Sequence, residues 1–253
     1  GDVFNPASYH SSVLQRMRVI YGKLVVKRVK NIRVVSERIK ASLLQLGVES
    51  HVVTVLPVQS DLQSLLGIGE TRQYKNTESL QLLFLGRLAA EKQISLIVDA
   101  CRLLRDRGVH FQLKIVGSGP EEINIKKQIS THDLSQQVTL IPWSDNISLL
   151  LEQADVFCLS SRHEGWGMVL LEAAAAGLPI VSTDVGCVGE CLFDGQSVLV
   201  ANHVEAYAQA LEILVSRVER ERIGTAAYTQ ATKYVESSKD YVAQWVVAHN
   251  PKD

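Results

Sequence analysis

Acidic residues are almost missing from the first 35 positions of the chain. Up to Val35 the only acid is Asp2, against seven lysines and arginines, so this segment carries a net charge of +6 while the whole chain carries −1. A basic segment of this kind indicates either an anionic partner or a solvated face, including one that contacts another domain. We favour the solvated face, keep contact with an anionic membrane as a second prediction, and expect no nucleic-acid partner.

Long apolar runs are also absent. No stretch approaches the roughly 18 apolar residues of a membrane span, and no basic start followed by an apolar run indicates a signal peptide. The chain begins with Gly1 and Asp2 rather than Met, which predicts a fragment or a processed form. Its 253 residues, 46% of them hydrophobic, are typical of a globular protein with one or two domains.

Cysteine is scarce, with four residues in the chain. Cys101 falls in an amphipathic helical pattern and Cys158 in an apolar strand, which predicts two small core residues. Cys187 and Cys191 have no second pair and no histidine beside them, so the pattern of a zinc site is missing. We therefore expect a reducing, cytoplasmic location, with peripheral contact at the membrane face as the alternative.

The chain lacks a Gly-x-Gly-x-x-Gly motif after a first strand, which argues against a dehydrogenase. From residue 79, however, apolar strands alternate regularly with amphipathic helices. A continuous apolar run such as residues 80–85 is typical of a buried parallel strand, and residues 93–107 place their apolar side chains on one helical face. We predict an α/β fold in which a Rossmann-like parallel sheet carries helices on both faces. Further strands are expected at 111–116, 138–141, 156–159 and 180–182.

The residues before 79 are organised differently. Residues 13–30 have the spacing of a basic amphipathic helix, and a strand at 32–35, a helix at 37–46 and a strand at 52–56 follow. Residues 59–78 are polar and contain two glycines, which predicts an irregular linker. The predicted segments are 1–58, the linker 59–78, a domain at 79–235 and a C-terminal helix at 236–253.

Ligands of parallel sheets lie at the carboxyl ends of the strands. The loop after strand 80–85 begins with Gly86 and places Arg87 and Lys92 on either side of an expected helix start. Helix N-termini attract anions, and an arginine fork with a lysine point charge suits a diphosphate. The alternative is two surface charges, paired in part with Glu91.

The loop after strand 156–159 combines glycines with carboxylates. Gly165 and Gly167 let the backbone approach a ligand and direct amides toward it. Glu164 and Glu172 lie eight residues apart, so both can flank one pocket and accept hydrogen bonds from sugar hydroxyls. A pair of glycosidase carboxylates is the alternative, but a glycine-rich helix start favours a phosphate-bearing ligand. Glu172 is also a lone charge in an apolar helix, where it needs a partner.

Three other strand ends are expected to complete the cleft. The glycine-rich loop at 184–190 would form one wall, and the segments 117–119 and 142–144 would cover a nucleobase. Trp143 fits stacking on a base and packing at the rim equally well.

Taken in order, these segments resemble the retaining glycosyltransferases of family 4, which have the two-domain architecture called GT-B. The resemblance runs from about residue 80 to 215 and rests on the ordered set rather than on any one piece. The sequence departs from the family pattern at Pro142, where glycine is usual, and at Gln196 and Ser197, where Asn-Gly is common. The matching segments are 84–88 with Glu91 and Lys92, 115–120, 154–156, Ser160 with Ser161, 164–173 and 177–183.

The resemblance implies a role for each loop. Arg87 and Lys92 would hold the donor diphosphate and stabilise charge on the departing phosphate, while Glu164 would contact the donor sugar and Glu172 the ribose. No metal or cofactor is implied beyond a nucleoside-diphosphate sugar, such as a UDP or GDP sugar, as co-substrate. Its sugar would pass with retention to a glycan or lipid-linked acceptor. The implied donor-binding residues are Gly86, Gly117, Trp143, Ser144, Gly165, Trp166, Gly167, Met168, Val169 and Glu172.

By the same resemblance, residues 1–58 are a remnant of an acceptor domain, 79–235 the nucleotide-sugar-binding domain, and 236–253 a helix that crosses back to the acceptor domain. The chain would then be the donor-binding half of a hexosyltransferase-type enzyme, and we expect it to be inactive alone. Two alternatives remain open. One is a sugar-nucleotide epimerase or a phosphorylase of the same architecture, and the other is a truncated, non-catalytic donor-binding module.

Overall fold

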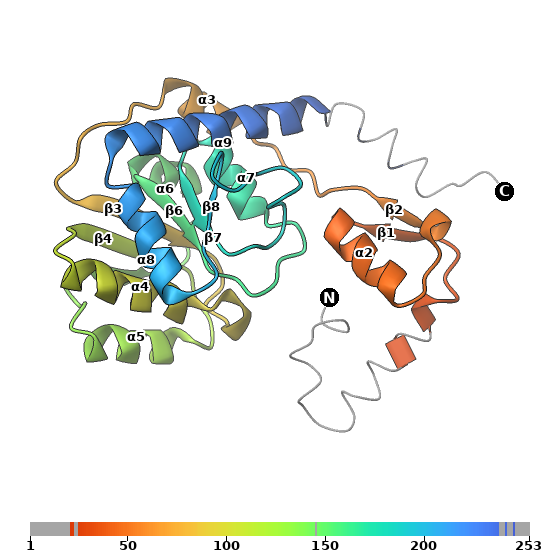
Figure 1. Cartoon of the computed structure of the whole chain (residues 1–253), viewed down its shortest axis with the longest axis horizontal. Coiled ribbons are helices and arrows are strands. Elements are labelled where there is room, and N and C mark those ends of the chain that lie inside the picture. Colours follow the sequence, from red (N-terminus) through yellow and green to blue (C-terminus); the bar gives the residue numbers. More distant parts are fainter. Residues whose placement is uncertain (1–20, 23–24, 145, 238–240, 242–244, 246–253) are drawn as a thin grey trace. The chain divides into compact units, whose positions relative to one another are not determined.

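The computed structural model describes residues 21–22, 25–144, 146–237, 241 and 245 of the chain. The chain divides into two compact units, one formed by residues 1–59 with 239–253 and the other by residues 60–238 (Figure 1). Most of the basic helix predicted at 13–30, and most of the C-terminal helix predicted at 236–253, lie outside the described residues.

The smaller unit contains a β-α-β arrangement. Strand β1 (Ile32–Val34) pairs in parallel with β2 (Val53–Val55), and helix α2 (Glu37–Gln45) and the 3-10 turn η3 (Ser50–Val52) connect them. The Oγ of Ser36 accepts a hydrogen bond from the amide of Ile39 at 3.2 Å and so caps the helix. The buried core residues are Val34, Leu43, Val48 and Val53.

A residue from the C-terminal end of the chain contacts this unit. The guanidinium of Arg33 donates one hydrogen bond to the carbonyl of Leu56 at 3.1 Å and another to the hydroxyl of Tyr241 at 2.7 Å. The same guanidinium carbon lies 6.0 Å from the centroid of the Tyr241 ring. Residue 241 therefore packs on the strand that carries Arg33.

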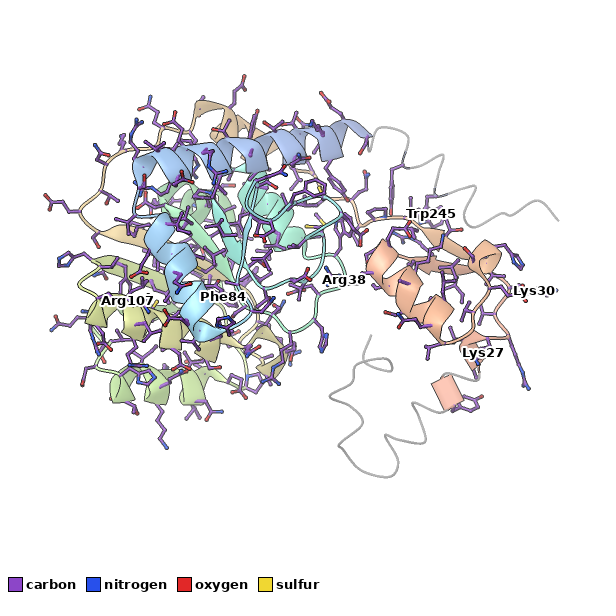
Figure 2. The ribbon with its side chains drawn as sticks, viewed as in Figure 1. Lys27, Lys30, Arg38, Phe84, Arg107 and Trp245 are labelled. Atoms are coloured by element: carbon purple, nitrogen blue, oxygen red, sulfur yellow. The ribbon has the colours of Figure 1, made fainter. Side chains whose placement is uncertain are left out.

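The larger unit is built on a parallel sheet with the strand order β5-β4-β3-β6-β7-β8. This is the doubly wound order, in which the direction of winding reverses between β3 and β6. Central strand β3 is buried on both faces, and Phe84 has no exposed surface (Figure 2). The predicted fold class is confirmed. The strands are β3 (Leu80–Leu85), β4 (Phe111–Val116), β5 (Val138–Ile141), β6 (Val156–Leu159), β7 (Ile180–Ser182) and β8 (Leu199–Val200).

Helices cover both faces of this sheet (Figure 1). On one face, Arg107 at the end of α4 ties that helix to α8 through Glu205 at 2.5 Å and Glu212 at 2.8 Å (Figure 2). The helices of this face are α4 (Ile94–Asp106), α5 (Glu122–Thr131) and α8 (Val204–Ile213). The opposite face carries α3 (Gln63–Thr71), α6 (Ile147–Gln153), α7 (Met168–Ala175) and α9 (Arg217–Ser237).

The prediction of an irregular linker over residues 59–78 is wrong for α3. The glycines that suggested a loop lie inside this helix, and its N-cap residue Leu62 and its apolar residue Leu65 are buried. Gly69 is there for packing, because a Cβ at this position would lie 2.2 Å from the carbonyl oxygen of Ala175 in α7. The glycine that this close packing requires is, in the sequence alone, a signal for a loop.

Candidate functional site

The site lies where the winding of the sheet reverses. Strands β3 and β6 are parallel neighbours, with Leu82 opposite Val156, so the loops that follow them leave the same edge side by side. These loops cover residues 86–92 and 160–168, the two segments in which the sequence predicted most of the chemistry. Ligands of doubly wound sheets bind in the crevice at this point.

Lys92 and Glu164 contact each other directly across the two loops. The Nζ atom of Lys92 lies 2.5 Å from Oε1 of Glu164, and the two side chains are only 20% and 14% exposed. The hydroxyl of Ser161 donates to the same carboxylate oxygen at 2.6 Å. The structure thus brings together two of the predicted site residues as a shielded ion pair.

Hydroxyl side chains for which no role was predicted hold the loops in place. The Oγ of Ser160 donates to the carbonyl of Lys92 at 2.7 Å, and the Oγ1 of Thr183 donates to the carbonyl of Ser161 at 2.6 Å. All three hydroxyl residues are buried. The signal in the sequence was a small hydroxyl residue directly after each of two apolar strands.

Arg87 and Lys92 do not flank a helix start as predicted. Residues 90–92 form a short 3-10 turn, η4 (Ala90–Lys92), and α4 begins only at Ile94, after Gln93 in the left-handed conformation. The side chain of Arg87 is exposed, and it has no hydrogen-bonding or ion-pair partner among the residues that the structure describes. The two cations therefore differ, since one is paired and shielded and the other is available to an anion from solvent.

The N-terminus of α7 faces the same edge. Gly167 caps this helix with φ 75°, a conformation that favours glycine. The first amides of a helix have no partner within it and carry partial positive charge. The third predicted loop supports this turn, because the amide of Cys187 donates to the carbonyl of Trp166 at 2.8 Å. A Cβ at Gly186 would lie 2.5 Å from that carbonyl oxygen, so the two loops pack tightly.

Trp166 points its side chain into the protein rather than toward the edge. The residue is 5% exposed, and its ring lies 5.9 Å from that of Tyr234 on α9, tilted by 32°. Its Nε1 atom has no hydrogen-bond partner in the described part of the chain. Any contact of this residue with the predicted donor would therefore come from its main chain, and its donor-binding role stays a prediction.

Glu172 is the fifth of the eight residues of α7 and is half-buried. Burial raises the pKa of its carboxyl group, and no described residue forms a hydrogen bond or ion pair with it. Met168 and Val169, in the turn before it, are also half-buried. A carboxylate without a protein partner in this position is suited to accept hydrogen bonds from a ligand.

The loop after β4 packs directly on the loop after β3. A Cβ at Gly117 would lie 1.9 Å from the carbonyl oxygen of Gly86, and the amide of Leu88 donates to the carbonyl of Ser118 at 2.9 Å. Gly117 is thus required by contact between two backbones, whereas the sequence analysis gave it a ligand-binding role, which stays a prediction.

The loop after β5 follows an edge strand of the sheet. Trp143 is 55% exposed, and the Oγ of Ser144 accepts a hydrogen bond from the amide of Asn146 at 3.2 Å, next to the start of α6. Both alternatives for Trp143, stacking on a base and packing at the rim, remain predictions.

The described residues contain neither a candidate membrane span nor a candidate metal site. None of the helices in this part of the chain has the length and apolarity needed to cross a bilayer. No group of three histidine, cysteine, aspartate or glutamate side chains in the same residues is placed to hold a metal ion.

Residues 70–230 match the family model of the glycosyl transferases group 1. The chain belongs to this family. Similar proteins include an uncharacterized glycosyltransferase of Haemophilus influenzae (30% identical over 145 residues, 56% of this chain and 41% of the relative) and the D-inositol 3-phosphate glycosyltransferase of Pseudarthrobacter chlorophenolicus (33% over 144 residues, 54% and 34%). The amylovoran biosynthesis glycosyltransferase AmsK of Erwinia amylovora is 32% identical over 151 residues, 56% of this chain and 37% of that protein. The chain thus spans 34 to 41% of the length of these relatives.

Solved glycosyltransferase structures share the fold. Anabaena Alr3699/HepE in complex with UDP and glucose superposes with a TM-score of 0.79 at 18% identity and covers 97% of this chain and 69% of its own. The pneumococcal O-GlcNAc transferase GtfA in complex with UDP and GlcNAc gives a TM-score of 0.71 at 23% identity, with 89% and 46% covered. Group 1 members of this kind have the GT-B architecture, and the larger unit of this chain has the parallel sheet and flanking helices of that fold.

Proposed function

We propose that this chain is the donor-binding half of a retaining glycosyltransferase of family 4. The nucleoside-diphosphate sugar would bind at the sheet edge between β3 and β6. The observation that carries the proposal is the meeting of Lys92 with Glu164 beside the glycine-rich start of α7, with Arg87 available nearby. Two cations and a cluster of main-chain amides suit a diphosphate without a metal ion.

The cations and amides would then act on the diphosphate of the donor, and the two carboxylates on its sugar and ribose. During transfer, the bond between the anomeric carbon and the phosphate oxygen breaks, and negative charge develops on the leaving diphosphate. Arg87, Lys92 and the amides of 165–168 would stabilise that charge. Glu164 would contact the sugar hydroxyls, and Glu172, which lacks a partner among the described residues, the ribose hydroxyls.

The names of the similar proteins favour a UDP sugar, because two of the superposed structures contain UDP. A glycan or lipid-linked acceptor agrees with the relative whose name refers to amylovoran biosynthesis. The epimerase alternative keeps the same diphosphate site, and no contact in the described residues favours either an epimerase or a phosphorylase.

Calorimetry with nucleoside diphosphates tests the proposed site, after a thermal-shift panel of UDP, GDP and ADP sugars has selected the base. We expect weak binding that Arg87→Ala or Lys92→Ala abolishes. Arg102→Ala is the matched control, since Arg102 is an exposed cation that pairs with Asp106 on α4 at 3.1 Å. Unchanged affinity in both site variants would contradict the diphosphate clamp.

We also propose that the basic segment lets the parent enzyme contact the cytoplasmic face of an anionic membrane. Lys27 and Lys30 are exposed on the smaller unit (Figure 2), and the apolar residues Val25 and Val29 between and beside them are 41% and 40% exposed. Exposed cations and apolar side chains together suit a lipid surface. Sedimentation with anionic vesicles that is no better than with neutral vesicles would reject this proposal.

A further inference from the structure

The C-terminal end of α7 is enclosed by α3 and the residues that follow it. The carbonyl oxygens of residues 175–177 are each contacted in turn. The backbone of Gly69 rests on the first, leaving no room for a Cβ. The Nε of Arg72 donates to the second at 2.5 Å, and the hydroxyl of Tyr74 donates to the third at 2.6 Å. We call Gly69, Arg72 and Tyr74 the α7 socket.

Arg72 connects two helices at once. Besides its bond to α7, its guanidinium donates to the carbonyls of Leu151 at 2.6 Å and Ala154 at 3.0 Å, at the end of α6. The last carbonyls of a helix lack partners within it and carry partial negative charge, so a cation there stabilises both ends. Burial lowers the pKa of Arg72, but an arginine stays protonated in a protein.

The socket holds α7 at its C-terminal end, while the contacts of Gly186 and Cys187 with Trp166 hold the turn before its N-terminus. Residues 173–176, at the end of this helix, are four buried alanines whose short side chains interlock little with their neighbours. At about 1.5 Å per residue, the eight residues of α7 span only about 12 Å and move as one rigid piece. Any displacement of its C-terminus therefore appears at its N-terminus, beside Gly167.

We propose that Arg72 is a positioning residue for the donor diphosphate. By holding the end of α7, it sets the place of the main-chain amides at 165–168 on the opposite end of that helix. The inference rests on the proposed function, because it assigns a purpose to the placement of those amides. It adds a residue that lies outside the loops of the site.

The test compares a nucleoside diphosphate with its nucleoside. UDP is titrated by calorimetry and uridine by ligand-observed NMR, or GDP and guanosine if the panel selects GDP, and the ratio of the two affinities measures the contribution of the phosphates. Arg72→Lys keeps the charge but loses the planar fork that joins the two helices. We expect this ratio to fall by about 10- to 100-fold, because small misplacements of binding groups have effects of that size.

Arg105→Lys is the matched control. Arg105 is half-buried near the end of α4, and its guanidinium donates to the carbonyl of His132 at the end of α5, away from the socket. This variant should lower the melting temperature to a similar degree without changing the ratio. A ratio that stays unchanged in Arg72→Lys, or falls equally in both variants, overturns the inference while the proposed function stands. A wild-type chain that binds no nucleoside diphosphate removes the proposed function and this inference with it.

Where Arg72→Lys does not fold, Tyr74→Phe decides. It removes only the hydroxyl that donates to the third carbonyl, and we expect a decrease of about threefold in the same ratio. No decrease in a folded Tyr74→Phe variant overturns the proposal.

Discussion

The negative charge of Glu164 affects both its own pairing with Lys92 and the binding of the proposed donor. Glu164 pairs with Lys92 in the structure, and in the proposed function the same lysine must reach the donor phosphate. Binding therefore has to break a shielded ion pair, which costs free energy because both groups have little access to water. The carboxylate competes with the ligand for its own cation.

This competition gives the first prediction. Glu164→Gln should raise the affinity for a nucleoside diphosphate by about two- to fivefold, because the lysine no longer has an anionic partner. The same variant should lower the preference for a UDP sugar over UDP, since its sugar contact is weakened. Calorimetry with both ligands checks the two effects, and a loss of UDP affinity would show that Glu164 does not compete.

Glu172 leads to a prediction about pH. Burial raises the pKa of this carboxyl group, so the folded chain keeps the proton at pH values where the unfolded chain has lost it. The associated stability is complete below the ordinary pKa of 4.5 and is lost as the pH rises through the raised value. Glu172→Gln should therefore increase the melting temperature by about 1–3 °C at pH 7 and leave it unchanged near pH 4.

Melting curves at the two pH values check this difference. Glu122→Gln is the control, because the side chain of Glu122 is 41% exposed and its carboxylate pairs with Lys126 at 2.6 Å. An equal gain at both pH values would contradict the pKa argument. Weaker nucleotide binding by Glu172→Gln is expected separately, from loss of the proposed ribose contact.

At the scale of elements, the loops after β3 and β4 pack on each other through their backbones, so a shift of one should move the other. Gly117→Ala should destabilise the chain by about 1–3 kcal/mol, because the new Cβ would collide with the backbone of Gly86. It should also displace the adjacent Arg87 and weaken diphosphate binding. Urea unfolding and calorimetry measure the two effects.

Gly108→Ala is the control that separates the backbone strain of a positive φ from a steric clash of the new Cβ. Gly108 also has a positive φ, 77°, but a Cβ there meets nothing within 4 Å. The control should cost about 1 kcal/mol and leave ligand affinity unchanged. Equal effects of the two substitutions on binding would show that the contact between the loops does not matter.

The elements also differ in how well the sequence predicts them. Strands β3 to β7 have the predicted bounds, because continuous apolar runs ended by glycine, proline or polar residues leave little ambiguity. Helix α3 was missed because the glycine that lets it pack on α7 is locally a loop signal. Local pattern and tertiary packing disagree there, and packing decides.

The candidate site was predictable to a similar extent. Strand ends identified the loops, and the parallel topology implied that they share an edge. The pairing of Lys92 with Glu164, the inward orientation of Trp166 and the contacts of Arg72 depend on residues distant in sequence, so no local pattern reports them. The roles of the individual site residues stay predictions.

At the scale of the whole molecule, the chain spans less than half the length of the relatives described above. In the proposed function, donor and acceptor would be enclosed between this donor-binding half and an acceptor domain. We therefore expect the purified chain to bind a nucleoside diphosphate and to release no UDP from a UDP sugar. Turnover by residues 1–253, measured as UDP release, would refute this expectation.

The unequal surroundings of Arg87 and Lys92 have a kinetic consequence. The exposed guanidinium extends its field into the solvent, where dissolved ions weaken it over roughly 10 Å, and in the proposed function it would govern how often an anion arrives. The ammonium group would engage only after a local exchange of partners, shielded from those ions, and would govern how long the anion stays. Added salt should therefore slow arrival far more than it hastens departure.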